Sequence, residues 1–129
     1  MINRQEVFDK VLTHLRKQGG VAVSSENGEC SYRGTAGSMC ALGCLILDEY
    51  YLPEMEGDSA NDVPVIAALI SSGYDVSSED EEFLVDVQSD MHDKYTIVRE
   101  DIQVEGFLPW LEDQAQEFAD IYELEYEKN

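Results

Sequence analysis

Basic residues are scarce in this sequence. Eight lysines and arginines stand against 28 aspartates and glutamates, which gives a formal net charge of −20 at pH 7. Affinity for nucleic acid comes from lysine and arginine neutralising phosphates, so direct binding of DNA or RNA is nearly excluded. The same negative field repels anionic membranes and attracts basic protein surfaces.

Long apolar runs are also lacking. The longest, Cys40–Leu47, contains a glycine and is far shorter than the roughly 20 residues of a membrane-spanning helix. The chain does not begin with a positively charged leader followed by an apolar stretch, so we expect no signal peptide. The sequence predicts a soluble cytoplasmic protein.

Cysteines are few and odd in number: Cys30, Cys40 and Cys44. A disulfide scaffold is therefore not expected, and reduced thiols are the default. Together with His92, the three thiols would offer zinc a tetrahedral set of ligands. However, their gaps of nine and three residues differ from the two-residue knuckle of zinc ribbons, and Cys40 and Cys44 lie in an apolar run. We interpret them as core residues and predict no bound metal or cofactor.

A thiol enzyme is the second chemical possibility, with Cys40 as nucleophile, His92 as base and Asp93 as the group that orients the base. Adjacent residues project about 100° apart on a helix, so Asp93 is not expected to hold His92. We expect His92 to bond the nearby fold from a helix face, and we predict no enzyme. A small thiol- or zinc-dependent protein built around Cys40 and Cys44 stays open as the alternative.

Two further ligand motifs are missing. Asp58, Asn61 and Asp62 lack the spacing of an EF-hand, and no glycine-rich phosphate loop is present. Neither calcium binding nor nucleotide binding is therefore predicted.

The length of 129 residues and the 43% apolar content predict a single domain over residues 1–129. Charge divides this domain unequally. Residues 1–52 hold six acids and five bases, a net charge of −1, whereas residues 53–129 hold 22 acids and three bases, a net charge of −19. The sequence thus predicts a near-neutral N-terminal half and a strongly acidic, helical C-terminal half.

Four segments show helical patterns. Asn3 and Glu6 resemble a capping box before a helix that ends at Gly19. A second helix follows Asn61 or Asp62 and ends at Gly73, and a third follows Ser77 or Ser78. The last begins near Phe107, and its predicted inner face is Leu108, Leu111, Ala115, Phe118, Ile121 and Tyr122.

Residues 21–47 show a different pattern. Val21–Val23 and Cys30–Arg33 flank a turn at Asn27-Gly28 and predict a short hairpin. The apolar run Cys40–Leu47 favours a strand, with a short helix near Asp48–Tyr51, and residues 95–104 favour a loop or edge strand. The predicted fold class is α+β and helix-rich, with four to five helices and a small β-hairpin or sheet near residues 21–47.

Several strings occur in an order that is typical of one family. They are Asn3–Val11, Cys30-Ser31-Tyr32-Arg33-Gly34, Cys40-Ala41-Leu42-Gly43-Cys44-Leu45-Ile46, Asp48–Tyr51, Met55–Gly57, and Gln88 with Met91–Asp93. Over about residues 3–95 the chain resembles an uncharacterised family of small phage and prophage proteins; the acidic last helix departs from that family's more mixed charge. The family has no established activity. The resemblance implies a phage-type origin and, by association, a role against the host.

Acidic residues recur at helical spacing in the C-terminal half, where neighbours three or four positions apart lie about 5–6 Å from each other. The first row, after Ser78, is Glu79, Glu82, Asp86, Asp90 and Asp93. The second row, expected on the last helix, is Asp113, Glu117, Asp120 and Glu127, flanked by Glu112 and Glu123. The two rows predict a partner-binding surface.

Like charges at this spacing destabilise a helix by roughly 0.2–0.5 kcal/mol per pair, and a surface that serves only solubility would intersperse bases. The hypothesis is therefore a non-enzymatic, phage-type inhibitor of a host defence protein, such as a restriction or CRISPR enzyme, or of a DNA-handling protein. Its acids would imitate nucleic acid in the basic channel of that host protein, in the host cytoplasm. A merely solvated surface stays open, as does a homodimer.

Overall fold

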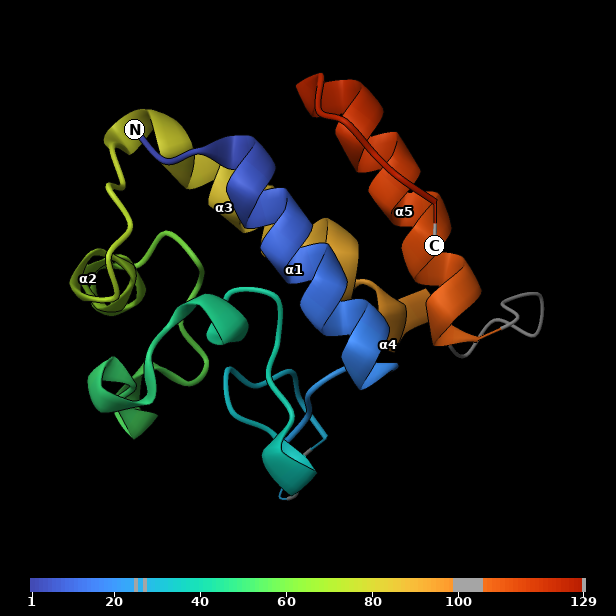
Figure 1. Ribbon diagram of the computed structural model, residues 1–129. Coiled ribbons are helices and arrows are strands. Elements are labelled where there is room, and N and C mark those ends of the chain that lie inside the picture. Colours follow the sequence, from blue (N-terminus) through green and yellow to red (C-terminus); the bar gives the residue numbers. More distant parts are fainter. Residues whose placement is uncertain (25, 27, 99–105, 129) are drawn as a thin grey trace.

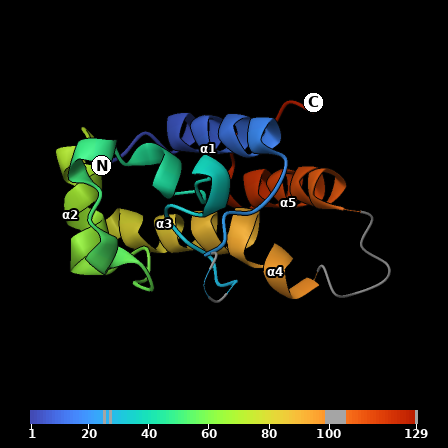
Figure 2. The same cartoon turned by 90° about the horizontal axis from the view of Figure 1, so that it is seen from below.

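The computed structural model describes residues 1–24, 26, 28–98 and 106–128. Its α-helices are α1 (Arg4–Gln18), α2 (Val63–Ser71), α3 (Glu81–Gln88), the single turn α4 (Tyr95–Val98) and α5 (Phe107–Tyr122). A π-helical turn, Ser89–Asp93, continues α3. Figures 1 and 2 show α1, α3 and α5 side by side, with α2 at the far end from α5.

The ends of α1 follow directly from the sequence. The Asn3 side chain accepts a hydrogen bond from the Glu6 amide at 3.0 Å, which satisfies one of the unpaired donors of the first turn. At the other end, Gly19 adopts a left-handed φ of 74°, and its amide donates to the Leu15 carbonyl at 2.9 Å. Both predicted ends of this helix are confirmed.

Aromatic packing holds α1, α3 and α5 together. Phe118 of α5 stacks on Phe8 of α1 with ring centroids 5.8 Å apart, and it lies 5.5 Å from the ring of Phe83 in α3. All three rings are buried. Burying aromatic side chains dominates the energetics of such a core, so these three helices form its stable centre.

Residues 20–62, which we name the turn segment, form a series of short turns. Its described residues include four single 3₁₀ turns: Thr35–Gly37, Gly43–Leu45, Asp48–Tyr50 and Pro53–Met55. The Arg33 guanidinium donates to the carbonyls of Gly43 at 2.7 Å and Ile46 at 2.8 Å. The Glu56 carboxylate accepts from the amides of Tyr32 at 2.8 Å and Arg33 at 3.0 Å. Two charged side chains thus bind backbone groups of this segment, of which the Gly43 carbonyl also accepts from the Ile46 amide at 3.3 Å.

The predicted α+β class is wrong. The described residues are helical and contain no strand; of the expected hairpin, a single isolated bridge between Val23 and Cys30 is present. Cys40–Leu47 is a turn followed by a 3₁₀ helix, because Arg33 and Gln88 bind the backbone groups that a neighbouring strand would otherwise pair.

Two smaller expectations also change. Tyr95–Val98 is the helical turn α4 where a loop or edge strand was expected, while residues 99–104 lie outside the described residues. Ile121 is 65% exposed and Leu108 is 42% exposed, so neither belongs to the inner face of α5. None of the helices in the described ranges has both the length and the apolar character to cross a membrane.

Candidate functional site

The predicted acidic residues divide into two groups. Seven of them are exposed: Glu79, Glu82, Asp113, Glu117, Asp120, Glu123 and Glu127. Four are half-buried, each with a partner inside the protein: Asp86, Asp90, Asp93 and Glu112. The surface expected from the sequence is therefore smaller than the eleven residues suggest.

The two acidic rows meet between α3 and α5. Lys94 lies at this junction and donates to Asp90 at 2.7 Å. That hydrogen bond raises the pKa of Lys94, and the charges of Asp86 and Glu117 raise it further. Tyr122 of α5 donates its hydroxyl hydrogen bond to Asp86 of α3. Lys94 is thus bonded to Asp90, and its charge is stabilised by an acid of α3 and an acid of α5.

Glu112 faces α1. The Arg16 guanidinium binds its carboxylate in a bidentate pair, with distances of 2.8 Å from Nε and 2.6 Å from Nη2. The side chains of both residues are only 19% exposed, and Tyr126 donates to the same carboxylate. Planar, bidentate pairing of this kind is among the stronger polar contacts. Glu112 therefore links α1 to α5 and does not belong to the exposed acidic surface on which the sequence had placed it.

Glu127 does not lie on the last helix, as the spacing had suggested. α5 ends at Tyr122, where Glu123 adopts a left-handed φ of 57° and the Leu124 amide donates to the Ala119 carbonyl at 2.8 Å. The chain then runs back, and Arg16 binds the Glu127 carbonyl at 2.7 Å. This end could not be recognised from the residues alone, because no glycine stands at the helix terminus.

Asp93 also departs from its expected place on the acidic row. Its Oδ1 accepts hydrogen bonds from His92 Nδ1 and from Gln88 Nε2, both at 2.7 Å. An ordinary helix would direct His92 and Asp93 about 100° apart. The wider π-helical turn Ser89–Asp93 changes these directions and lets adjacent side chains meet. The expectation that Asp93 cannot hold His92 is wrong.

The hydrogen bonds of His92 define its protonation state. This side chain is completely buried, and its Nε2 accepts from the Ala22 amide at 2.9 Å. A ring nitrogen that accepts carries no proton, so Nδ1 holds the proton and donates it to Asp93. Both ring nitrogens are thus used within the fold. This bears out the interpretation of His92 as a residue that bonds the nearby fold.

This arrangement bears on metal binding. Among the described residues, the ligand atoms that lie within 4.8 Å of one another belong to Cys30, His92 and Asp93. Cys40 and Cys44 do not belong to this group, so the set of three cysteines and one histidine is not assembled. Because Nε2 of His92 is occupied by a backbone amide and Nδ1 carries a proton, His92 offers a metal ion no lone pair.

The thiols considered as nucleophiles lie in apolar surroundings. Burial raises the pKa of the Cys40 thiol far above its ordinary value, and it raises that of Cys44 to about 12. The thiolate is the reactive form of cysteine, and neither residue reaches that form near neutral pH. The cysteines at positions 30, 40 and 44, all within the described ranges, form no disulfide.

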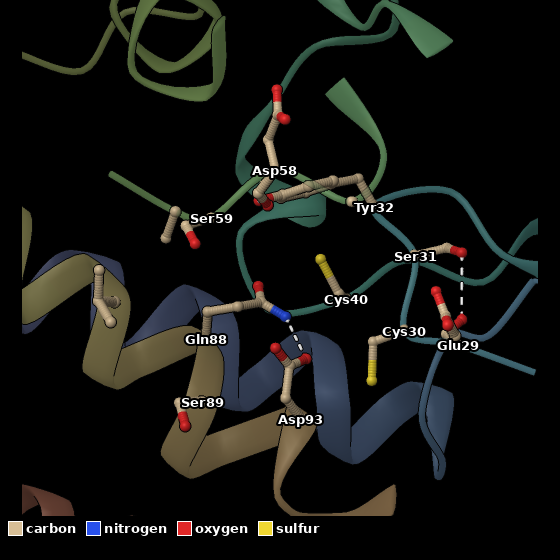
Figure 3. A pocket seen from close by; sticks show the side chains of 13 residues that line it. Glu29, Cys30, Ser31, Tyr32, Cys40, Asp58, Ser59, Gln88, Ser89 and Asp93 are labelled. Carbon is tan, nitrogen blue, oxygen red and sulfur yellow. Dashed lines mark hydrogen bonds between the residues drawn. The ribbon is translucent and has the colours of Figure 1, made fainter. Parts of the chain in front are cut away.

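A cavity of about 430 Å³ lies beside Asp93 (Figure 3). It lies between two parts of the turn segment, residues 29–32 and 57–60, and α3 with its π-helical turn. Tyr32, Cys40, Gln88 and Asp93 are among the residues that line it. Sequence reasoning missed this cavity, although Tyr32, Cys40 and Gln88, which contribute to its walls, lie in strings that the sequence analysis had singled out.

Comparison of the chain with protein-family models, with curated proteins and with solved structures gives no match in any of the three. The acidic surface and the cavity are therefore the features from which a function can be inferred.

Proposed function

We propose that this protein is a non-enzymatic inhibitor that binds the basic, nucleic-acid-gripping surface of a partner protein. The contact is made by the α3–α5 acidic face, which we define as Glu82, Asp86, Asp90, Asp113, Glu117 and Asp120. The proposal rests on the exposed acids of α3 and α5, two helices that the Tyr122–Asp86 hydrogen bond joins, and on the near absence of bases among them, where Lys94 is bonded to Asp90.

The spacing of these acids supports imitation of a nucleic-acid strand. Asp113, Glu117 and Asp120 lie on the exposed side of α5 at intervals of four and three residues. Neighbours at these intervals are about 5–6 Å apart. A protein that grips nucleic acid neutralises its phosphates with lysine and arginine, and complementary charge speeds the encounter of the two surfaces.

The partner class follows from this charge together with the resemblance to phage proteins. A host defence protein or a DNA-handling protein has a basic channel and is a target that a phage gains from blocking. The action is binding and not catalysis, which is supported by the engaged nitrogens of His92 and the raised thiol pKa values of Cys40 and Cys44. The same observations leave the thiol- or zinc-dependent alternative without support.

A matched pair of charge reversals tests the proposal on a partner captured from host-cell lysate. Asp113→Lys, Glu117→Lys and Asp120→Lys together should abolish binding while the circular dichroism spectrum and Tm stay close to those of the wild type. The control reverses three exposed acids of the near-neutral half, Glu6→Lys, Asp9→Lys and Glu49→Lys, and changes the net charge equally. If the control loses as much binding, total charge matters and the α3–α5 acidic face does not.

Competition distinguishes a nucleic-acid mimic from any other acidic binder. A mimic occupies the channel itself, so inhibition should fade as the concentration of DNA or RNA rises. Binding should also weaken with salt, because exposed charges are screened within about 8–10 Å at physiological ionic strength. A stable ternary complex of inhibitor, partner and nucleic acid at saturating concentrations would contradict the mimic.

A further inference from the structure

The helix α2 is apolar on its outer side as well as on its inner side. Its inner residues, among them Val65 and Leu69, are buried in the core. The outer side, which we name the α2 stripe, is Val63, Ile66, Ala67 and Ile70. Val63 is 81% exposed and Ile70 is 52% exposed. Spacing at i, i+3, i+4 and i+7 is typical of a face that a helix packs against another element, yet the α2 stripe is open to solvent.

The α2 stripe contains no charge, although it lies in the acidic half of the chain. No charged residue stands between Asp62 and Asp75, and this is the longest uncharged run in residues 53–129. The exposed side of α5, by contrast, carries Asp113, Glu117 and Asp120. A surface that served only solubility would carry charges on α2 too. An exposed apolar face of this kind is typical of a site that another protein surface covers.

The charge of the protein favours a second copy of this chain as the partner of α2. Two molecules that each carry a net charge of −20 repel one another wherever their acids meet, and the α2 stripe offers a contact without acids. This helix lies at the far end from α5, so two copies joined there keep the acids of α5 apart (Figures 1 and 2). A basic partner would instead be attracted to the acids of α3 and α5.

We propose that two copies of the protein associate through α2, with the two helices antiparallel about a two-fold axis. The axis passes between Ile66 and Ala67, the middle of the stripe, so that Val63 of each copy packs on Ile70 of the other. The small Ala67 side chain lets the helices approach closely. Leu47, whose amide donates to Ser72 Oγ at the end of α2, is 48% exposed and adds apolar surface beside the helix.

The size of this contact predicts a weak dimer. With nine residues, α2 is about 14 Å long, and a stable complex buries roughly 800 Å² on each partner. A single short helix and its surroundings provide less, so the dimer should depend on protein concentration. Asp62 and Asp75 flank the helix and leave some repulsion between the copies. Because salt screens like charges, it should strengthen this association, whereas it should weaken binding to a basic partner.

Sedimentation equilibrium over a range of protein concentrations, at low and at high salt, tests the proposal. The average mass should rise from monomer toward dimer, and more steeply at high salt. Ile70→Glu places an unpaired charge in the contact and should weaken association by at least about tenfold. The matched control is Ile121→Glu, the same substitution at an exposed position of α5, which should associate as the wild type does.

Cross-linking tests the arrangement of the helices. Ala67→Cys places a thiol beside the two-fold axis, so oxidised glutathione should convert this variant into a disulfide-linked dimer on a non-reducing gel. Val63→Cys should not cross-link, because antiparallel packing puts the two copies of residue 63 at opposite ends of the contact. The wild type, with its three native cysteines, is run beside them. Cross-linking of Val63→Cys and not of Ala67→Cys would overturn the antiparallel arrangement.

Three results would overturn the dimer: a monomer at every concentration and salt, association that weakens with salt, or equal effects of Ile70→Glu and Ile121→Glu. The proposed inhibition is tested separately, because Ile70→Glu leaves the α3–α5 acidic face unchanged. If Ile70→Glu loses the captured host partner while the wild type is monomeric, α2 contacts that partner and not a second copy.

Discussion

The helices α1, α3 and α5 and the turn segment of residues 20–62 share one apolar core but differ in the further contacts that join their parts. Stacked aromatic rings of Phe8, Phe83 and Phe118 join the three helices. In the turn segment, side chains such as Arg33 and Glu56 bind backbone amides and carbonyls. Apolar packing tolerates many sequences with the right pattern, whereas these hydrogen bonds require particular side chains at particular positions.

The glycines of the helices and of the turn segment serve different purposes. A Cβ at Gly43, in the turn segment, would lie 2.4 Å from the Tyr32 carbonyl oxygen, so no other residue fits there without moving the backbone. Gly19, at the end of α1, has open space around it and is required only for its positive φ. Close approach of backbone to backbone is thus a property of the turn segment.

The largest expected effect lies in the helical core. Phe118→Ala removes the ring that contacts both Phe8 and Phe83, and it should lower the free energy of unfolding by about 3–5 kcal/mol. Ile121→Ala on the same helix, at a position 65% exposed, should change it by only about 0.5 kcal/mol. Urea denaturation of both variants measures the difference, and similar losses would mean that α5 packs in another orientation.

A smaller effect is expected in the turn segment. Glu56→Gln turns one of the two accepting oxygens into a donor, which faces either the Tyr32 amide or both the Arg33 amide and the Tyr51 hydroxyl, and it should cost roughly 1.5–3 kcal/mol. The exposed Glu54→Gln is the control. If both substitutions are neutral in urea denaturation, hydrogen bonds to Glu56 do not hold this segment.

The dependence of stability on pH distinguishes buried acidic side chains from exposed ones. Burial alone would raise the pKa of Asp80, but hydrogen bonds from the amides of Ser77 and Ile2 outweigh it and hold the pKa below its ordinary value. Asp80 therefore stabilises the fold above about pH 4, and this contribution is lost as the pH falls further.

Asp80→Asn should flatten the loss of Tm between about pH 4 and 2, while Asp113→Asn on the exposed side of α5 should follow the wild type. Tm measured at several pH values in this window compares the three proteins. Parallel curves for Asp80→Asn and the wild type would show that Asp80 does not contribute to acid sensitivity.

Removal of metal ions is expected to leave the stability of the protein unchanged. The imidazole of His92 has both nitrogens engaged, so a chelator such as EDTA should leave Tm unchanged. Elemental analysis of the purified protein gives an independent measurement. A large fall in Tm with EDTA, restored by zinc, would show that Cys30 and Asp93 bind a metal with a rearranged His92.

Sequence pattern by itself determined several helix ends of this protein. The cap at Asn3, the end at Gly19 and the start of α5 at Phe107 were all predicted, because capping and helical periodicity depend on residues a few positions apart. The concentration of acidic residues after residue 52 was equally evident from the sequence. The sequence did not show which residues each of those acids contacts.

Contacts between distant residues decided the rest. Pairing with Arg16 turned Glu112 inward over a separation of 96 residues, and the Ala22 amide fixed the tautomer of His92 over a separation of 70. The run Cys40–Leu47 became a turn and not a strand because Arg33 and Gln88 reach its backbone. Local pattern cannot encode such choices, since a backbone group pairs with whichever partner the tertiary fold brings within hydrogen-bond distance.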